Sequence, residues 1–91
     1  TPMEMMELAA ETLELTESLL GRFNDSAASD LGVAALSLRS AIQGAWLNVR
    51  INISSIKDQD LAERSRERGE ALLAKALPAA DRIYAAVLDM M

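Results

Sequence analysis

The chain has 91 residues, of which 51% are apolar and 3% aromatic, so it is long enough for one small domain but not for two. Fourteen acidic against nine basic residues give a net charge of −5, which would repel a phosphate backbone or an anionic membrane, so we expect neither nucleic acid nor membrane as a partner. The sequence contains no cysteine and no histidine, which excludes disulfides, thiolate catalysis and the commonest zinc ligands. We therefore expect no metal, and chemistry that uses carboxylates, amides, hydroxyls, Arg or Lys.

No apolar run approaches the roughly 20 residues that a membrane-spanning helix needs. The first residues, Thr1-Pro2-Met3-Glu4, lack the basic start of a secretory signal, so we expect a cytoplasmic protein. Ala, Leu, Glu, Arg and Met fill most positions, and proline occurs only twice. This usage is typical of long helices, and the predicted fold class is all-α.

Apolar residues three and four positions apart predict a first helix over about residues 3–21, and Pro2 suits its first turn. The other face of this helix carries four acidic residues at the same spacing: Glu4, Glu7, Glu11 and Glu14. Such a stripe could dock a basic partner, but we interpret it as a solvated face. Turn formers between Gly21 and Ser29 then separate it from a second helix, predicted over about residues 28–54.

Asp58 is a good N-cap for a third helix over about residues 59–90. Pro78 lies inside this segment, where a proline removes one backbone hydrogen bond and clashes with the preceding turn, so we expect a kink or a break near Leu77. The sequence thus predicts a bundle of three long helices. We expect this bundle to be part of a larger helical domain or of a dimer.

The second helix is predicted to have apolar residues on two opposite sides. On a helical wheel at 100° per residue, the first apolar stripe is Leu31, Ala35, Leu38, Ile42, Ala45, Val49, Ile53 and Ile56. The second stripe is Val33, Leu36, Leu47 and Ile51, with Ser40 among them. A helix that is apolar on both sides lies between two layers. The first and third helices supply only part of this cover, so we expect further helices of the same domain or a second copy of the chain.

Between the two stripes runs a strip of small and polar residues, which we call the polar strip: Asp30, Ala34, Ser37, Ala41, Gly44, Asn48, Asn52 and Ser55. Its small residues would let another helix approach closely and bury the two asparagines. Asn48 and Asn52 are then either structural amides that fix the register of a bundle or part of a ligand site. Asp30, expected in the first turn, is either a partner of the helix dipole or a site residue.

Three runs of residues, in order and at matching intervals, resemble the signatures of the formiminotetrahydrofolate cyclodeaminase and methenyltetrahydrofolate cyclohydrolase family. They are Asn24-Asp25-Ser26-Ala27-Ala28-Ser29-Asp30-Leu31-Gly32-Val33-Ala34-Ala35, Gly44-Ala45-Trp46-Leu47-Asn48-Val49-Arg50-Ile51-Asn52 and Ile56-Lys57-Asp58. Phe23 stands where the family usually has a glycine before the asparagine. The resemblance covers essentially the whole chain. It implies that residues 1–91 are the C-terminal portion of a single helical domain about twice as long.

The resemblance implies one-carbon folate chemistry of the kind used in histidine degradation. The cyclodeaminase, an ammonia lyase, closes N10 of 5-formiminotetrahydrofolate onto the formimino carbon and expels ammonia, giving 5,10-methenyltetrahydrofolate. That step needs a base and an acid, and Asp30, the only acid on the polar strip, is the implied catalytic residue. The implied substrate-binding residues are Asn24, Ser29, Asn48, Asn52, Arg50, Lys57 and Asp58. On the wheel, Arg50 points to the opposite side of the helix from Asp30.

A tetrahydrofolate derivative is therefore the expected substrate, and a homodimer or higher homo-oligomer the expected assembly. The missing N-terminal half of the domain is a further expected partner, without which the isolated chain is expected to be inactive. Two alternatives remain open. One is the cyclohydrolase reaction of the same family, and the other is a non-catalytic helical oligomerisation module that uses the same apolar faces to assemble.

Overall fold

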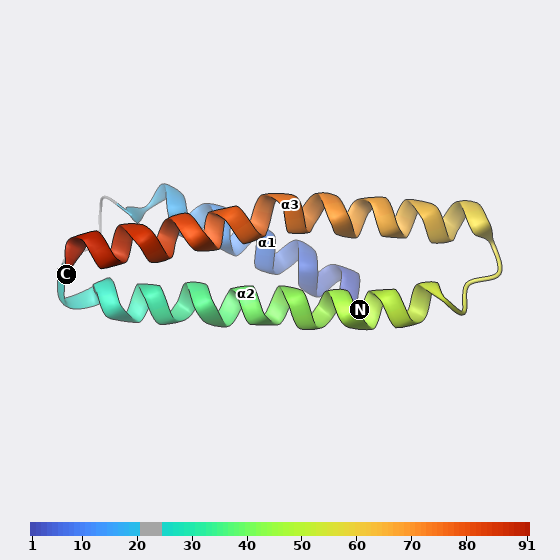
Figure 1. Cartoon of the computed structure of the whole chain (residues 1–91), viewed down its shortest axis with the longest axis horizontal. Helices are drawn as coiled ribbons and strands as arrows, with labels where there is room; N and C mark the ends of the chain where they lie inside the picture. The colour runs from blue at the N-terminus through green and yellow to red at the C-terminus, as the bar shows by residue number, and fades with distance from the viewer. Residues whose placement is uncertain (21–24) are drawn as a thin grey trace.

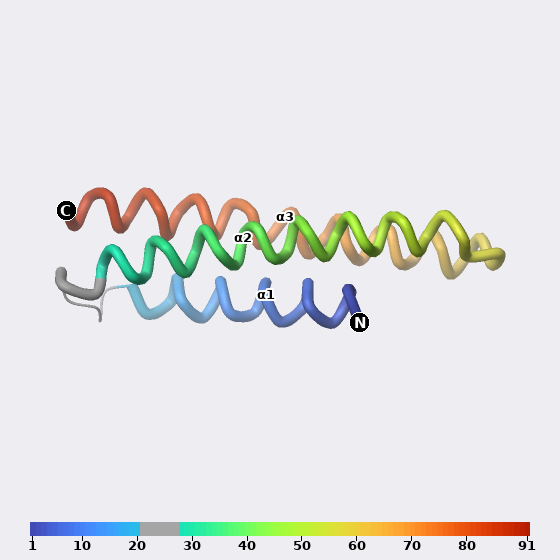
Figure 2. Tube along the Cα trace, turned by 90° about the horizontal axis from the view of Figure 1, so that it is seen from below, coloured from blue at the N-terminus to red at the C-terminus, as the bar shows by residue number. Residues whose placement is uncertain are grey.

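The computed structural model describes residues 1–20 and 25–91, with residues 25–27 described by their backbone alone. In these residues three helices form an elongated bundle of 50 × 17 × 17 Å (Figure 1). Helix α1 spans Pro2–Ser18, α2 spans Asp25–Ile53 and α3 spans Gln59–Met90. The predicted all-α bundle is confirmed. Helices α1 and α3 run in the same direction and α2 runs against them, and the α2–α3 hairpin extends beyond the start of α1 (Figures 1 and 2).

Side chains cap the starts of α1 and α3. The Thr1 hydroxyl accepts a hydrogen bond of 3.3 Å from the backbone N–H of Glu4, and Pro2 occupies the first turn of α1. The Asp58 carboxylate accepts hydrogen bonds from the backbone N–H groups of Asp60 and Leu61, at 3.0 and 3.2 Å. It therefore caps α3 as predicted.

Two helix boundaries differ from the prediction by more than one residue. Helix α1 ends at Ser18, three residues before the predicted end, and α2 begins at Asp25, three residues before the predicted start. We expected either a kink or a break near Leu77. Helix α3 continues through Pro78, so the chain has no break there. Pro78 is exposed, while Ala76 and Ala79 close to it in the sequence are buried in the core.

The core forms where the first apolar stripe of α2 meets the other two helices. Six residues of this stripe are buried: Leu31, Ala35, Ile42, Ala45, Val49 and Ile53. They belong to one cluster with Met6 and Leu13 of α1 and Ile83 and Val87 of α3. Full burial of such a side chain contributes about 1.5–3 kcal/mol. The second stripe of α2 is exposed in the single chain, with Val33, Leu36, Leu47 and Ile51 between 47 and 66% exposed.

Glycines let α3 approach α2 closely at two points. A Cβ atom added to Gly32 would lie 3.2 Å from Cγ1 of Val87, and one added to Gly69 would overlap the Trp46 ring. Gly44 differs, because a Cβ added there would have no contact within 4 Å. The internal packing of the chain therefore explains Gly32 and Gly69 but not Gly44.

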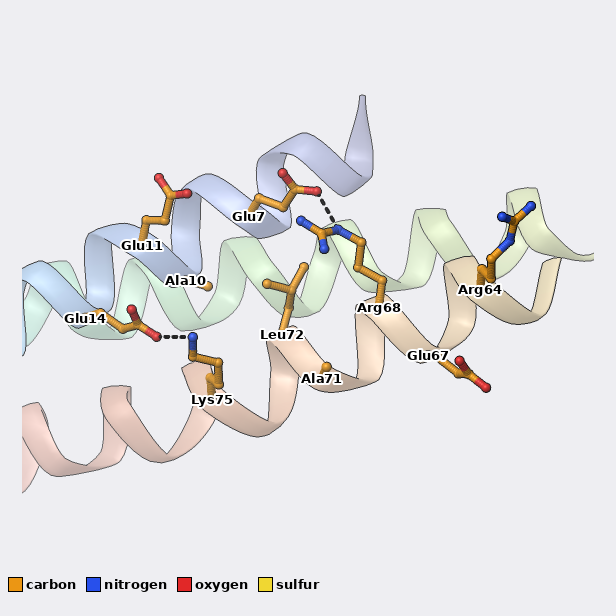
Figure 3. Close-up of a pocket in the computed structure, with 10 residues that line it drawn as sticks. All are labelled: Glu7, Ala10, Glu11, Glu14, Arg64, Glu67, Arg68, Ala71, Leu72 and Lys75. Carbon is orange, nitrogen blue, oxygen red and sulfur yellow. Dashed lines mark hydrogen bonds and ion pairs between the residues drawn. The ribbon is translucent and has the colours of Figure 1, made fainter. Parts of the chain in front are cut away.

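Ion pairs join α1 to α3 along their common edge. Glu7 binds Arg68 at 2.8 Å, Glu14 binds Lys75 at 2.9 Å, and Glu17 binds Arg82 (the first two are drawn in Figure 3). The three cations are spaced seven residues apart, which places them on one face of α3. The acidic stripe of α1 is therefore not simply a solvated face, since two of its members bind basic residues of the same chain.

Gly69→Ala should displace Trp46, because the new methyl group overlaps the indole ring. Trp46 is the single tryptophan, so the tryptophan emission reports on the surroundings of this one ring. We expect a red-shifted emission maximum as the ring moves into water. The exposed neighbour Glu70 provides the control, and Glu70→Ala should leave the emission unchanged. An unshifted spectrum for Gly69→Ala would contradict the packing described for this contact.

The Glu17 ion pair should make stability depend on pH. The hydrogen bond from Arg82 holds the pKa of the Glu17 carboxyl below its ordinary value, partly offset by burial. A lowered pKa means that the stabilisation is complete above the ordinary carboxyl pKa and is lost as the pH falls through the lowered value. Glu17→Gln should therefore reduce the melting temperature at pH 7 and have no effect at a pH below the lowered pKa.

The reduction should be small, since an exposed ion pair contributes about 1 kcal/mol or less. Glu11→Gln is the matched control on the same helix, because Glu11 has no ion pair within the described residues. Equal melting shifts for the two variants at pH 7 would rule out a stabilising role for the Glu17 pair.

Candidate functional site

The polar strip of α2 is exposed from end to end in the single chain. Neither α1 nor α3 covers it, so Asn48 and Asn52 are not buried by a close helix within this chain. In Figure 2 α2 lies between α1 and the C-terminal part of α3 in projection, and in Figure 1 it runs along the lower edge of the bundle. The side of α2 that faces away from the core is therefore open to a ligand or to another chain.

The earlier start of α2 changes the interpretation of Asp30. Because the helix begins at Asp25, Asp30 lies in its second turn and not in the first. The attraction between a carboxylate and a helix dipole is weak beyond the first turn. The helix dipole therefore does not explain an acid at position 30. Asp30 and its neighbour Ser29 are both exposed.

The predicted site residues on α2 share one edge but do not lie together. Asp30 and Asn48 are separated by 18 residues of continuous helix, or about 27 Å, and Asp30 and Asn52 by about 33 Å. The helical wheel correctly places these groups on one side, but it carries no information about separation along the axis. Within one chain they form two half-sites at opposite ends of α2. One half-site contains Asp30, and the other contains Asn48 and Asn52.

Asn52 lies beside the start of α1, in a shallow groove that the sequence did not predict. The groove is lined by residues of all three helices and the α2–α3 turn: Thr1, Pro2, Met3, Val49, Asn52, Ile53, Ile56 and Ser65. Most of its lining is apolar, with the Asn52 amide as a polar group. The half-site at this end of α2 therefore combines hydrogen-bonding and apolar surface, as small-molecule sites commonly do.

Arg50 lies on the side of α2 that carries Trp46 and faces α3, whereas the wheel predicted only that it points away from Asp30. Its guanidinium carbon is 5.6 Å from the centre of the Trp46 ring, a cation–π distance, and Trp46 in turn packs on Gly69 of α3. Arg39, on the same strip, binds Asp81 of α3. Arg50 is therefore turned away from Asp30, Asn48 and Asn52 of its own chain.

The remaining predicted residues are placed as follows. Exposed Lys57 and Asp58 lie in the turn between α2 and α3, at the Asn52 end of the bundle. The Asp58 carboxylate serves as the N-cap of α3, which gives it a structural role. Asn24 lies outside the described residues.

A second groove, between α1 and α3, also escaped the sequence analysis (Figure 3). It is lined by charged residues of both signs, Glu7, Glu11, Glu14, Arg64, Glu67, Arg68 and Lys75, together with Ala10, Ala71 and Leu72. Two of its carboxylates are bound to Arg68 and Lys75. It contains none of the predicted site residues, and its charges serve to join the two helices.

None of the three described helices combines the length and the apolar character that crossing a bilayer requires. Within the part of the chain that the structure describes, acidic side chains do not gather in the groups of three or more that could hold a metal ion.

The chain matches known proteins of one family. The family model described as formiminotransferase-cyclodeaminase matches residues 1–71. A methenyltetrahydrofolate cyclohydrolase of Methylorubrum extorquens is 34% identical over 86 residues, which cover 94% of this chain and 41% of that protein. A formimidoyltransferase-cyclodeaminase of Rattus norvegicus is 33% identical over 75 residues, covering 82% of this chain and 14% of that protein. No solved structure gives a significant match.

The chain thus spans less than half the length of each of these relatives. The matched residues include all of α1 and α2 and the first part of α3, and therefore both half-sites on the polar strip. This chain belongs to the formiminotransferase-cyclodeaminase family.

Proposed function

We propose that this chain contributes to a folate one-carbon enzyme that converts 5-formiminotetrahydrofolate to 5,10-methenyltetrahydrofolate and ammonia. The observation that carries the proposal is the family match over residues 1–71, which takes in the motifs around Asp30 and around Asn48 and Asn52. The exposure of these three residues on the polar strip supports it, since they are available to a substrate.

Asp30 is proposed to move protons in this reaction. As N10 bonds to the formimino carbon it must lose its proton, and the departing nitrogen must gain protons to leave as ammonia. A carboxylate can accept the first proton and, once protonated, donate it to the leaving nitrogen. Asp30 is the only acid on the polar strip, so no other carboxylate on this edge of α2 is placed for that role.

Asn48 and Asn52 are proposed to bind the pterin ring. They lie four residues apart and so point to the same side of α2, and each amide offers both a donor and an acceptor. Paired amides of this kind suit the alternating nitrogens and carbonyl of a pterin edge. Ser29, Asn24, Lys57 and Asp58 are secondary candidates for substrate contacts.

Arg50 is proposed as a partner for the glutamate carboxylates of folate. Its position over Trp46 turns it away from the polar strip of its own chain, so it can serve only a substrate that reaches it from another side.

The methenyltetrahydrofolate cyclohydrolase reaction is the second candidate. It is favoured by one observation, the cyclohydrolase name of the M. extorquens relative, which aligns with 94% of this chain. In that reaction water, and not an amine, attacks the one-carbon unit of 5,10-methenyltetrahydrofolate. The Asp30 carboxylate would then serve as the base that takes a proton from the water. A non-catalytic oligomerisation module is the third candidate function. The exposed second apolar stripe of α2 supports it.

Activity is proposed to need more than these 91 residues. The chain covers 41% of the M. extorquens relative, and the second stripe of α2 is bare in the single chain. We propose a further helical region, corresponding to the N-terminal half of the domain, and a second copy of the chain as partners. The 91 residues alone should release no ammonia from 5-formiminotetrahydrofolate.

Asp30→Asn, made in the full-length product of the gene, should reduce turnover at least 100-fold, because general acid–base catalysis contributes about 10² to 10⁴. Ammonia release from 5-formiminotetrahydrofolate and hydrolysis of 5,10-methenyltetrahydrofolate are measured side by side. The substrate that the unaltered protein consumes decides between the two reactions. Asp89→Asn, at another exposed acid, is the control and should keep full turnover.

Because Asp30 is exposed, the melting temperature of Asp30→Asn should stay close to that of the unaltered protein. Unchanged turnover would remove Asp30 from the catalytic role. A changed oligomeric state or melting temperature, without any folate turnover in the unaltered protein, would favour the non-catalytic module.

A further inference from the structure

Trp46 and Arg50 form a pair on the side of α2 that faces α3. They lie four residues apart on one helix, so their side chains are neighbours. The guanidinium carbon of Arg50 is 5.6 Å from the centre of the Trp46 ring, within the range of a cation–π attraction. Trp46 is half-buried and Arg50 is exposed. The ring therefore belongs to the interface between the helices, and the cation faces water.

Gly69 of α3 makes room for the Trp46 ring. A Cβ atom added to Gly69 would overlap the Cζ3 and Cε3 atoms of the indole. Gly69 is buried and lies inside a 32-residue helix, where glycine is a poor helix former. Any larger residue at position 69 would force the ring to move. The glycine therefore fixes where the indole lies.

Arg50 keeps its hydrogen-bond donors available. None of the ion pairs within residues 1–20 and 25–91 includes Arg50. Five other basic side chains bind carboxylates there: Arg39, Arg66, Arg68, Lys75 and Arg82. A cation–π contact uses the charge of the guanidinium, which leaves its N–H groups for other partners. Arg50 can therefore still bind a carboxylate.

An ordered guanidinium binds an anion better than a freely rotating one. An exposed arginine loses rotamer freedom when it binds a ligand, and that loss weakens binding. Contact with Trp46 restricts Arg50 before any ligand arrives, and Trp46 is itself held over Gly69. The three residues thus form a chain of contacts from the buried side of α3 to an exposed cation.

Resting on the function proposed above, we propose that Trp46 and Gly69 are positioning residues that hold Arg50 ready for the glutamate carboxylates of folate. Trp46 acts on Arg50 directly, and Gly69 acts through Trp46. A guanidinium binds a carboxylate through two parallel N–H···O hydrogen bonds, and the glutamate part of folate offers two carboxylates.

The proposal concerns the glutamate end of the substrate alone. Arg50 points to the opposite side of α2 from Asn48 and Asn52, which are assigned to the pterin end. The positioning residues are also remote from the reacting one-carbon unit. Loss of their effect should therefore weaken substrate binding and leave the chemical step unchanged, which raises KM without lowering kcat.

Steady-state kinetics of the full-length product of the gene test the proposal with two substrates. One is the folate that the unaltered protein consumes, and the other is the corresponding pteroate, which lacks the glutamate part. Arg50→Ala should raise KM for the folate about tenfold or more, since hydrogen bonds to charged groups are lost. Trp46→Leu should raise it about threefold, because an exposed cation–π contact is weaker. Neither variant should change kcat, or KM for the pteroate.

Gly69→Ala should repeat the Trp46→Leu result without altering either residue of the pair, because its methyl group displaces the ring. Trp46→Phe keeps an aromatic face and should bring KM back to within about twofold of the unaltered protein. Glu70→Ala, at the exposed neighbour of Gly69, is the control and should change neither constant. Partial loss of folded protein lowers kcat for both substrates alike, so it does not imitate the predicted pattern.

A binding measurement follows the same arginine without turnover. In isotope-labelled protein, the Nε–H signal of Arg50 is assigned by its loss in Arg50→Lys. This signal should move when tetrahydrofolate is added and stay in place when tetrahydropteroate is added. In Trp46→Leu the signal should already be displaced in the free protein, because the ring current of the indole is gone, and tetrahydrofolate should bind more weakly.

Three results would overturn the proposal. The first is an Arg50 signal that tetrahydrofolate does not move. The second is a KM for the folate that rises in Arg50→Ala but not in Trp46→Leu or Gly69→Ala. The third is an equal rise of KM for the folate and the pteroate.

The two readouts separate this proposal from the proposed function. An Arg50 signal that tetrahydrofolate moves, with weaker binding in Trp46→Leu, would keep the positioning role even if the unaltered protein turned over neither folate. Full turnover with an unmoved Arg50 signal would keep the proposed reaction and remove the positioning role.

Discussion

Burial of one apolar stripe of α2 against α1 and α3 is the constraint on which the rest of the structure depends. Ile42, fully buried, and Leu31, Val49 and Ile53 fix which side of this 29-residue helix faces inward. Since the stripe runs the full length of the helix, the rotation of α2 is set from one end to the other. The opposite side, with the polar strip and the second apolar stripe, must then face outward along its whole length.

The contacts of α3 refine this arrangement. Trp46 over Gly69, and Val87 against Gly32, fix how closely α3 approaches α2, while Arg39 and Asp81 join the two helices at the surface. Together they occupy the side of α2 that carries Arg50. Helix α1 lies on the other flank, near Asn52, and is joined to α3 by its ion pairs. The internal packing thus leaves one face of α2 free, and the polar residues of the family motifs lie on it.

Periodicity and capping chemistry predicted most of the fold. The apolar spacing predicted three helices, and Asp58 marked the start of α3 because an acid there satisfies free backbone N–H groups. The ends facing the first loop were displaced by three residues, since turn formers near position 21 mark a loop without fixing where its hydrogen bonding begins. The ion pairs between α1 and α3 were missed, because they depend on which helices are neighbours. The wheel placed Asp30, Asn48 and Asn52 on one edge but could not show their separation along the axis.

The central claim is that α2 is one continuous helix that holds Asp30 and Asn52 at opposite ends of an outward edge. The most direct test is a distance measurement between spin labels on the doubly substituted chain, Asp30→Cys with Asn52→Cys, diluted with unlabelled protein so that only distances within one chain are seen. The account predicts a single distance of about 33 Å, broadened by the label linkers. A distance near half that value would mean that the helix bends back and that one chain can bring both groups together, which would contradict the account.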